Sequence, residues 1–169
     1  MRETLVVLPL FLFFFIHLLP FHVIIHHCFG KAFMRQIQLL GYAGLVPFVG
    51  LTLLQLWPQF LALSLPYSAF MSYSQIILAF MAGVLWPVLY QQPGRYFPLW
   101  VVSFALIGWF SCLLAAPDQL LMLAAAFAAL RLFEVWHHSL LAYSPEYNRL
   151  RNHLTVVVLV CHLLYWWSL

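Results

Sequence analysis

Long apolar runs separated by short polar stretches fill almost the whole of the 169-residue chain. A helix needs about 20 such residues to cross a bilayer core that is about 30 Å thick. Six runs meet or approach this length, and they cover residues 5–28, 36–57, 66–90, 98–116, 118–141 and 145–169. Because the connections are short, consecutive helices should be antiparallel neighbours. The pattern predicts an all-α integral membrane bundle of six transmembrane helices with short loops.

Charged residues are scarce enough to support this prediction. Hydrophobic residues make up 66% of the chain and charged residues 7%, whereas a soluble domain carries about 25% charged residues. The few basic residues form no dense cluster, which argues against nucleic acid as a partner. Any charge inside an apolar run is costly, so each one needs a reason.

The N-terminal segment begins like a signal peptide but lacks a small-x-small cleavage site. We therefore expect a retained first span, so that residues 1–35 form a transmembrane helix with a basic loop and residues 36–169 form a five-helix membrane core.

The basic residues of the loops predict the orientation of the bundle. If the helices alternate, only Arg2 lies on one side. Five basic residues then lie on the other side: Lys31, Arg35, Arg95, Arg149 and Arg151. This distribution predicts a multi-pass protein of the bacterial or mitochondrial inner membrane, with both termini outside the cytoplasm or matrix.

The segment LRLFEVWHH, residues 130–138, places ionisable side chains in an otherwise apolar run. Arg131, Glu134 and His138 are spaced by three and four residues, which puts them on one helix face. The predicted depth of Gln75 in the third helix matches that of Arg131, so its carbonyl is expected to accept from the guanidinium. The sequence therefore predicts an intramembrane polar cluster that contains Gln75, Arg131, Glu134, His137 and His138.

Arg131 and Glu134 are interpreted first as an ion pair that fixes packing, and the alternative is a proton or ligand pathway. Removing one member of an isolated pair should cost more than removing both. Glu134→Gln is then the most damaging change and the double Gln variant the mildest. Arg131→Gln is intermediate, because the remaining carboxyl can take up a proton.

Two further helix faces are expected to pack closely. In GYAGLVPF, Gly41 and Gly44 permit close approach, and Pro47 should kink the helix and free a backbone carbonyl for a neighbour. The third helix carries small and polar residues at helical spacing, which predicts an inward face formed by Ser68, Ser72, Gln75, Ala79 and Ala82.

Histidines and arginines offer two other candidate sites. His22 and His26 are four residues apart, a spacing at which two imidazoles can share a metal ion or a haem, although hydrogen bonding to neighbouring helices or headgroups is the favoured interpretation. Tyr147, Arg149 and Arg151 stand at the start of the last helix, where long basic side chains reach lipid headgroups or a partner protein.

Three blocks of sequence are similar to one known family. They are LGYAGLVPF (40–48), YSQIILAFMAGVLWP (73–87) and YNRLRNHLTVVVL (147–159). Together they resemble a family of small polytopic membrane proteins of unknown function that includes transmembrane protein 69. The resemblance covers about residues 36–169, which makes the first helix an addition to the family core. Glu134 stands where the family carries an acidic residue, while Leu85 replaces a histidine found in other members. The resemblance implies a helical bundle and no established activity.

Three functions of different classes remain open. The favoured one is a non-enzymatic accessory or assembly subunit of a larger membrane complex, for example a respiratory one, surrounded by the lipid bilayer. The second is a redox component that binds haem or a metal ion through His22 and His26. The third is a small proton-coupled transporter centred on Arg131 and Glu134. The sequence shows no nucleophile with a positioned base and no glycine-rich phosphate loop, so an enzyme is not favoured.

Overall fold

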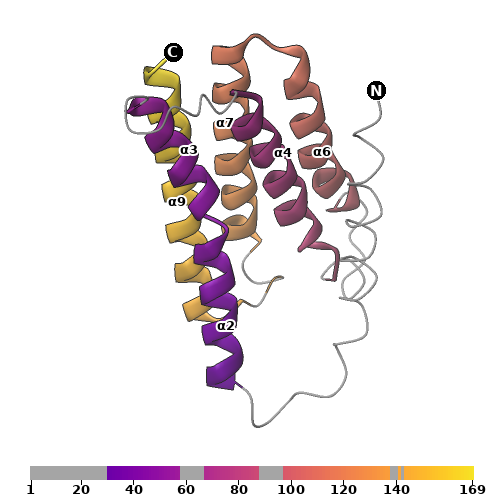
Figure 1. Ribbon diagram of the computed structural model, residues 1–169. Coiled ribbons are helices and arrows are strands. Elements are labelled where there is room, and N and C mark those ends of the chain that lie inside the picture. The colour runs from indigo at the N-terminus through magenta and orange to yellow at the C-terminus, as the bar shows by residue number, and fades with distance from the viewer. Residues whose placement is uncertain (1–29, 58–66, 88–96, 138–140, 142) are drawn as a thin grey trace, which may run out of the picture. The chain divides into compact units, whose positions relative to one another are not determined.

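A computed structural model describes residues 30–57, 67–87, 97–137, 141 and 143–169 (Figure 1). The chain divides into two compact units, Met1–Ile37 and Gln38–Leu169. In the first unit the described residues are helical and begin α2 (Gly30–Ala43). The predicted first span, residues 5–28, lies outside the described residues, as do His22 and His26. The predicted domain boundary after residue 35 stays a prediction.

The second unit is helical wherever it is described in regular structure, and no strand occurs among these residues. After the end of α2 come α3 (Val46–Leu56), α4 (Tyr67–Gly83), α6 (Phe97–Phe110), the 3₁₀ turn η1 (Ser111–Leu113), α7 (Ala116–Trp136) and α9 (Pro145–Trp167). The all-helical prediction is confirmed for this part of the chain. Two helical stretches, Met34–Leu56 and Ala116–Trp136, are long and apolar enough to cross a membrane.

Local sequence explains where the last helix begins. Ser144 has an extended backbone and its hydroxyl accepts from the backbone N–H of Tyr147 at 3.2 Å. Pro145 follows in the first helical position, where its missing N–H costs nothing, and Glu146 favours the positive end of the helix dipole. Ser144 is therefore the N-cap of α9.

The expected break near Pro47 is present. A turn at residues 44 and 45 separates α2 from α3, and Pro47 stands in the first turn of α3. The backbone carbonyl of Gly44 accepts from the Tyr73 hydroxyl of α4 at 2.8 Å. A Cβ on Gly41 would lie 3.1 Å from the Leu154 side chain of α9, so this glycine lets the two helices approach closely.

The helices of the second unit form one bundle (Figure 1). α7 packs against α9, α4 and α6, while α3 packs against α4 and α9. Phe48 of α3 lies near the centre of the core, and its ring contacts those of Phe70, Tyr73 and Phe127 at centroid distances of 5.7, 5.0 and 6.2 Å. Segments from every part of the second unit thus converge on one aromatic core.

The inward face of α4 differs from the predicted one. Ser68 and Ser72 are exposed. The buried residues are Phe70, Met71, Ser74, Leu78 and Ala82. Ser74 satisfies its hydroxyl by donating to the Phe70 carbonyl at 2.8 Å, which lets a polar residue pack inward. Ala82 is the one residue of the predicted face that is buried, and large apolar side chains fill most of the other buried positions of α4.

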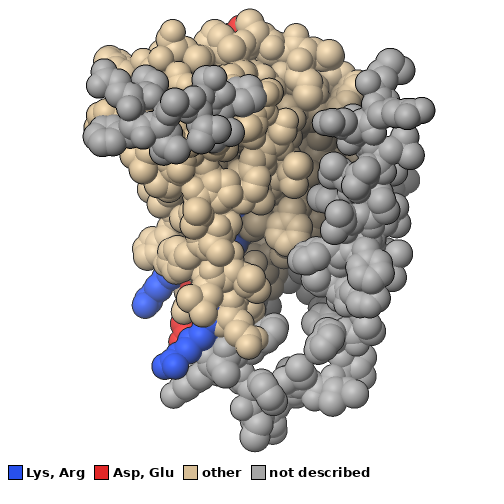
Figure 2. Space-filling model, viewed as in Figure 1, with Lys and Arg blue, Asp and Glu red and all other residues tan. Residues whose placement is uncertain are grey.

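The outer face of the bundle is also apolar. In α6, Val101, Phe104 and Gly108 are buried, at the three- and four-residue spacing of one helix face, and Ser111 of η1 continues this face. The opposite face exposes Leu99, Trp100, Leu106, Trp109 and Phe110. Figure 2 shows a mostly uncharged surface on which the few charged side chains lie towards the ends. Exposed apolar area of this extent is unusual for a protein surrounded by water.

Candidate functional site: a buried ion network

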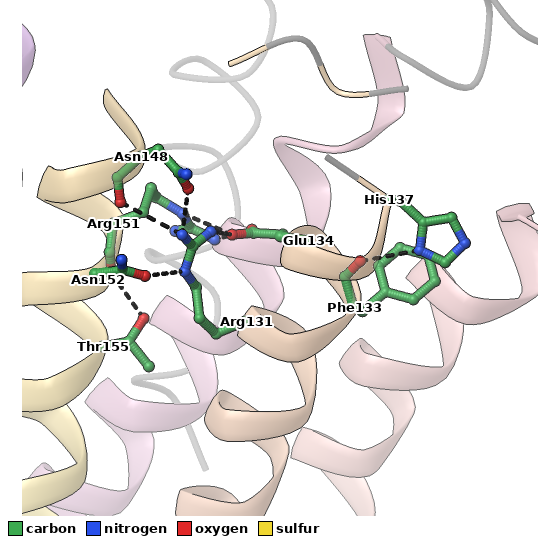
Figure 3. Close-up of polar contacts among 8 residues, drawn as sticks. All are labelled: Arg131, Phe133, Glu134, His137, Asn148, Arg151, Asn152 and Thr155. Atoms are coloured by element: carbon green, nitrogen blue, oxygen red, sulfur yellow. Dashed lines mark hydrogen bonds and ion pairs between the residues drawn. The ribbon is translucent and has the colours of Figure 1, made fainter. Parts of the chain in front are cut away.

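The most polar part of the bundle interior joins α7 to α9 (Figure 3). Arg131 and Glu134 come from α7, one helical turn apart, and Arg151 comes from the second turn of α9. The exposed fraction is 7% for Arg131, 1% for Glu134 and 5% for Arg151. Three charges therefore lie in a region with little access to water, where each must be compensated by its neighbours.

Both arginines point at the single carboxylate (Figure 3). Arg131 Nη1 donates to Glu134 Oε2 at 2.9 Å, and Arg151 Nε donates to the same oxygen at 3.1 Å. Arg151 Nη2 donates to the other oxygen, Oε1, so that Arg151 holds the carboxylate with two nitrogens. The predicted Arg131–Glu134 ion pair is present, and Arg151 extends it to a triad.

Arg131 also binds the facing surface of α9 directly. Its Nε donates to Asn152 Oδ1 at 2.7 Å, and its Nη2 donates to the backbone carbonyl of Asn148 at 3.4 Å and to the Asn148 side-chain oxygen. A planar guanidinium can make these contacts only in one orientation. The network thus fixes the register of α9 along α7, as well as neutralising charge.

The triad carries a net charge of +1. Two guanidinium groups face one carboxylate, and the polar neighbours Asn148 and Asn152 are neutral. Both oxygens of Glu134 accept from arginine, which leaves no free carboxylate to take up and release protons. The arrangement suits a structural clamp or the binding of an anion better than proton transfer.

Two tyrosines lie beside the triad. The Tyr143 ring contacts that of Tyr147 at 4.8 Å, and the Tyr143 hydroxyl is buried with no hydrogen-bond partner among the described residues. Burial, together with the nearby Glu134 carboxylate, raises the pKa of Tyr143, so the phenol keeps its proton. It therefore remains a hydrogen-bond donor that the described part of the chain does not use.

Gln75 is not part of this cluster, so the expected contact with Arg131 is wrong. Its side-chain amide donates to the Ser111 hydroxyl and to the Cys112 sulfur, both at 3.1 Å, which joins α4 to the end of α6. His137 is turned away from the triad (Figure 3), and its Nδ1 lies 2.9 Å from the Phe133 carbonyl. His138 lies outside the described residues.

The residues of the predicted headgroup site differ in their surroundings. Arg151 is buried against Glu134, and its predicted contact with headgroups or a partner stays a prediction. Tyr147 is half-buried against Tyr143. Arg149 is exposed, and its predicted contact with headgroups or a partner stays a prediction.

The sequence reasoning missed Asn148 and Asn152, although a signal for them exists. They are four residues apart on α9, so they share a face with each other and with Arg151. The prediction matches residues of the third and fifth helices by their depth in the membrane, whereas the fifth and sixth helices are directly connected in the sequence. Arg131 and Arg151 are equally far from residue 141, between the two helices, so a comparison across this connection would have brought them together.

One other buried polar group has an unmatched atom. His162 of α9 is 1% exposed, and its Nδ1 lies 2.8 Å from the Val158 carbonyl. Because a carbonyl only accepts, Nδ1 carries the hydrogen and Nε2 is left without a partner. The ring packs against Phe70 and Phe127 at 4.9 and 5.6 Å. Among the described residues, no group of three or more metal-ligating side chains gathers here or elsewhere.

In its described parts the chain is helical, with two helical stretches able to cross a membrane and an arginine-rich clamp between α7 and α9. The chain belongs to the family described as "Protein of unknown function (DUF3429)", which matches residues 33–167. In comparisons with curated proteins and with solved structures, nothing matches. The likeness to transmembrane protein 69 stays an expectation.

Proposed function

We propose that this chain is a multi-pass membrane protein that acts as a non-enzymatic accessory or assembly subunit of a larger membrane complex. The proposal includes six transmembrane helices and places both termini outside the cytoplasm or matrix. The observation that supports it best is that the buried charges pair with one another while the exposed surface is largely apolar.

The exposed surface supports placement in a bilayer. Large apolar side chains are exposed along α7 and α9 as well as α6, and they include Leu132, Val135, Val156, Val160 and Leu163. Trp136 at the end of α7 is 87% exposed and Trp167 at the end of α9 is 82% exposed. Tryptophans at helix ends are typical of the membrane–water interface.

The outer face of α6 supports docking to another membrane protein. Among the described elements, α6 packs mainly on α4, α7 and the following turn. Trp100 and Trp109 are 56% and 61% exposed, although the Trp100 ring also contacts that of Phe133 at 6.1 Å. Large, rigid indole rings are the residues that most often anchor a protein interface. The network between α7 and α9 would keep this face in a fixed shape, which a docking subunit requires.

The two alternatives have less support. The transporter alternative needs a carboxylate that can change partners, whereas both oxygens of Glu134 are held by arginines. The haem or metal alternative rests on His22 and His26, which lie outside the described residues, so it stays a prediction.

Purification in a mild detergent tests the accessory function. We expect the tagged chain to migrate in native electrophoresis as part of a stoichiometric complex several times larger than its own 19.6 kDa. Replacing Trp100 and Trp109 by Ala should release the chain from the complex, since interface tryptophans each contribute about 2 kcal/mol or more. Trp136→Ala, a change of another exposed indole, is the matched control and should leave the complex intact.

Two results would contradict this function. One is a chain that migrates alone at every detergent concentration that keeps it folded. The other is a complex that loses the chain equally in the Trp136→Ala control. A haem absorption band or a stoichiometric metal in the purified protein would favour the redox alternative instead.

The orientation can be tested with the cysteines of the chain itself. Cys112, at the end of α6, is exposed and should react with a membrane-impermeant maleimide added to intact cells. A cysteine introduced as Arg149→Cys should react only after the membrane is opened, because the proposal places the start of α9 on the opposite side. Cys161 is buried and serves as the unreactive control, with Cys28 replaced by Ser. Labelling of both sites from outside would refute the orientation.

A further inference from the structure

The triad and its neighbours carry more donors than acceptors. A guanidinium has five N–H groups. Two of those of Arg151 donate to Glu134, and the other three have no hydrogen bond among the described residues. The side-chain amide nitrogens of Asn148 and Asn152 are unused in the same part of the chain, because only their oxygens accept from Arg131. The unused hydrogen-bonding groups of this cluster are thus almost all donors.

The Tyr143 hydroxyl adds to this set. It is buried, it has no partner among the described residues, and it lies close enough to Glu134 and Arg151 for their charges to act on it. A phenol can donate to Glu134 or to an anion beside Arg151. Among the described residues the Tyr143 hydroxyl makes no hydrogen bond to Glu134, and an added anion would supply the acceptor that matches this donor.

The charge of the cluster points in the same direction. Two arginines and one glutamate leave a net charge of +1 in a region where the three side chains are at most 9% exposed. Among the described residues no second carboxylate forms an ion pair with either arginine. A buried charge without a counterion is costly, so an anion supplied from outside the chain would stabilise the folded state.

We propose that the junction of α7 and α9 binds the phosphate group of an anionic phospholipid, which accepts from Arg151, Tyr143 and the Asn152 amide and neutralises the triad. The planar guanidinium of an arginine can donate to two oxygens of one phosphate group, which a monatomic anion does not offer. The lipid source is favoured because the site lies near Trp136, an exposed indole at the end of α7, the level at which headgroups stand. This inference goes beyond the proposed function and shares only its placement in a membrane.

The test uses the delipidated full-length chain in a neutral detergent and measures its Tm. Phosphatidylglycerol added to the micelles should raise the Tm by about 5 °C, whereas phosphatidylcholine, whose headgroup has no net charge, should raise it much less. Inorganic phosphate at millimolar concentration should have little effect. An equal shift with inorganic phosphate would overturn the lipid assignment. Since no partner protein is present, the outcome is independent of the accessory function.

Two variants test the site itself. Asn152→Asp keeps the oxygen that accepts from Arg131 and adds the missing negative charge, so the shift with phosphatidylglycerol should fall to the level seen with phosphatidylcholine. Tyr143→Phe removes one donor and leaves the triad intact, and it should weaken phosphatidylglycerol binding about tenfold.

Arg149→Gln is the matched control, because Arg149 is exposed and lies in the same turn of α9 as Arg151. It should retain most of the shift with phosphatidylglycerol. If this control loses the shift while Asn152→Asp and Tyr143→Phe keep it, the lipid is attracted by surface charge and the proposed site is wrong.

Discussion

Replacing Glu134 by Gln should lower the free energy of unfolding by about 3–5 kcal/mol, because it leaves two buried arginines facing each other without a carboxylate. The amide has one accepting oxygen in place of two and no negative charge, and an arginine does not lose its proton to relieve the charge. Unfolding by SDS titration in one mild detergent measures the effect. Glu146→Gln, a change of an exposed carboxylate in the first turn of α9, is the control and should alter the stability by less than about 1 kcal/mol.

Because Arg151 also binds Glu134, the expected order of destabilisation among the Gln variants differs from that of an isolated Arg131–Glu134 pair. Arg131→Gln leaves Arg151 and Glu134 as a balanced pair, so it should cost only the hydrogen bonds of Arg131 to Glu134, Asn148 and Asn152, about 1–3 kcal/mol. The double variant Arg131→Gln, Glu134→Gln leaves Arg151 alone and should be almost as unstable as Glu134→Gln. A double variant more stable than Arg131→Gln would mean that Arg151 does not depend on Glu134.

Replacing Phe48 by Ala should lower the free energy of unfolding by about 3 kcal/mol. Phe48 is 1% exposed, and its ring contacts Phe70, Tyr73, Phe127 and the His162 ring, the last at 5.8 Å. These contacts join α3 to α4, α7 and α9, so the cavity would open at the point where four helices meet. In a bilayer the loss comes mainly from packing contacts, since lipid chains are as apolar as the core.

Phe80→Ala provides the comparison for Phe48→Ala. Phe80 is the same residue type on α4, but it is 45% exposed, so its removal leaves no internal cavity. The same SDS titration should show a change of less than about 1 kcal/mol. Equal losses for the two variants would mean that the aromatic core does not hold the helices together.

The positions of the helices along the chain could be predicted well from the sequence. Runs 98–116 and 145–169 correspond to α6 with η1 and to α9, with ends that differ by a few residues. Prolines and an N-cap serine mark these starts through backbone geometry, which depends on neighbouring residues alone. The break before Pro47, and the carbonyl that it leaves for Tyr73, follow from the same local rule.

The faces of the helices were harder to predict for a physical reason. When the outside of a bundle is apolar, hydrophobicity does not distinguish inward from outward residues. In α4, Ser72 faces outward while Leu78 is buried. The predicted contact of Arg131 with Gln75 fails for the same reason. Equal depth in the membrane does not show which helix faces α7, and the structure places α9 there.

The pairing of both buried arginines with Glu134 is the central claim of this account, and one difference in stability tests it. A variant with Gln at positions 131, 134 and 151 contains no buried charge in the network, whereas Glu134→Gln keeps two. We expect the triple variant to be more stable than Glu134→Gln by at least about 2 kcal/mol in the same SDS titration. A triple variant that is less stable than Glu134→Gln would show that the three residues act independently, and it would contradict the account.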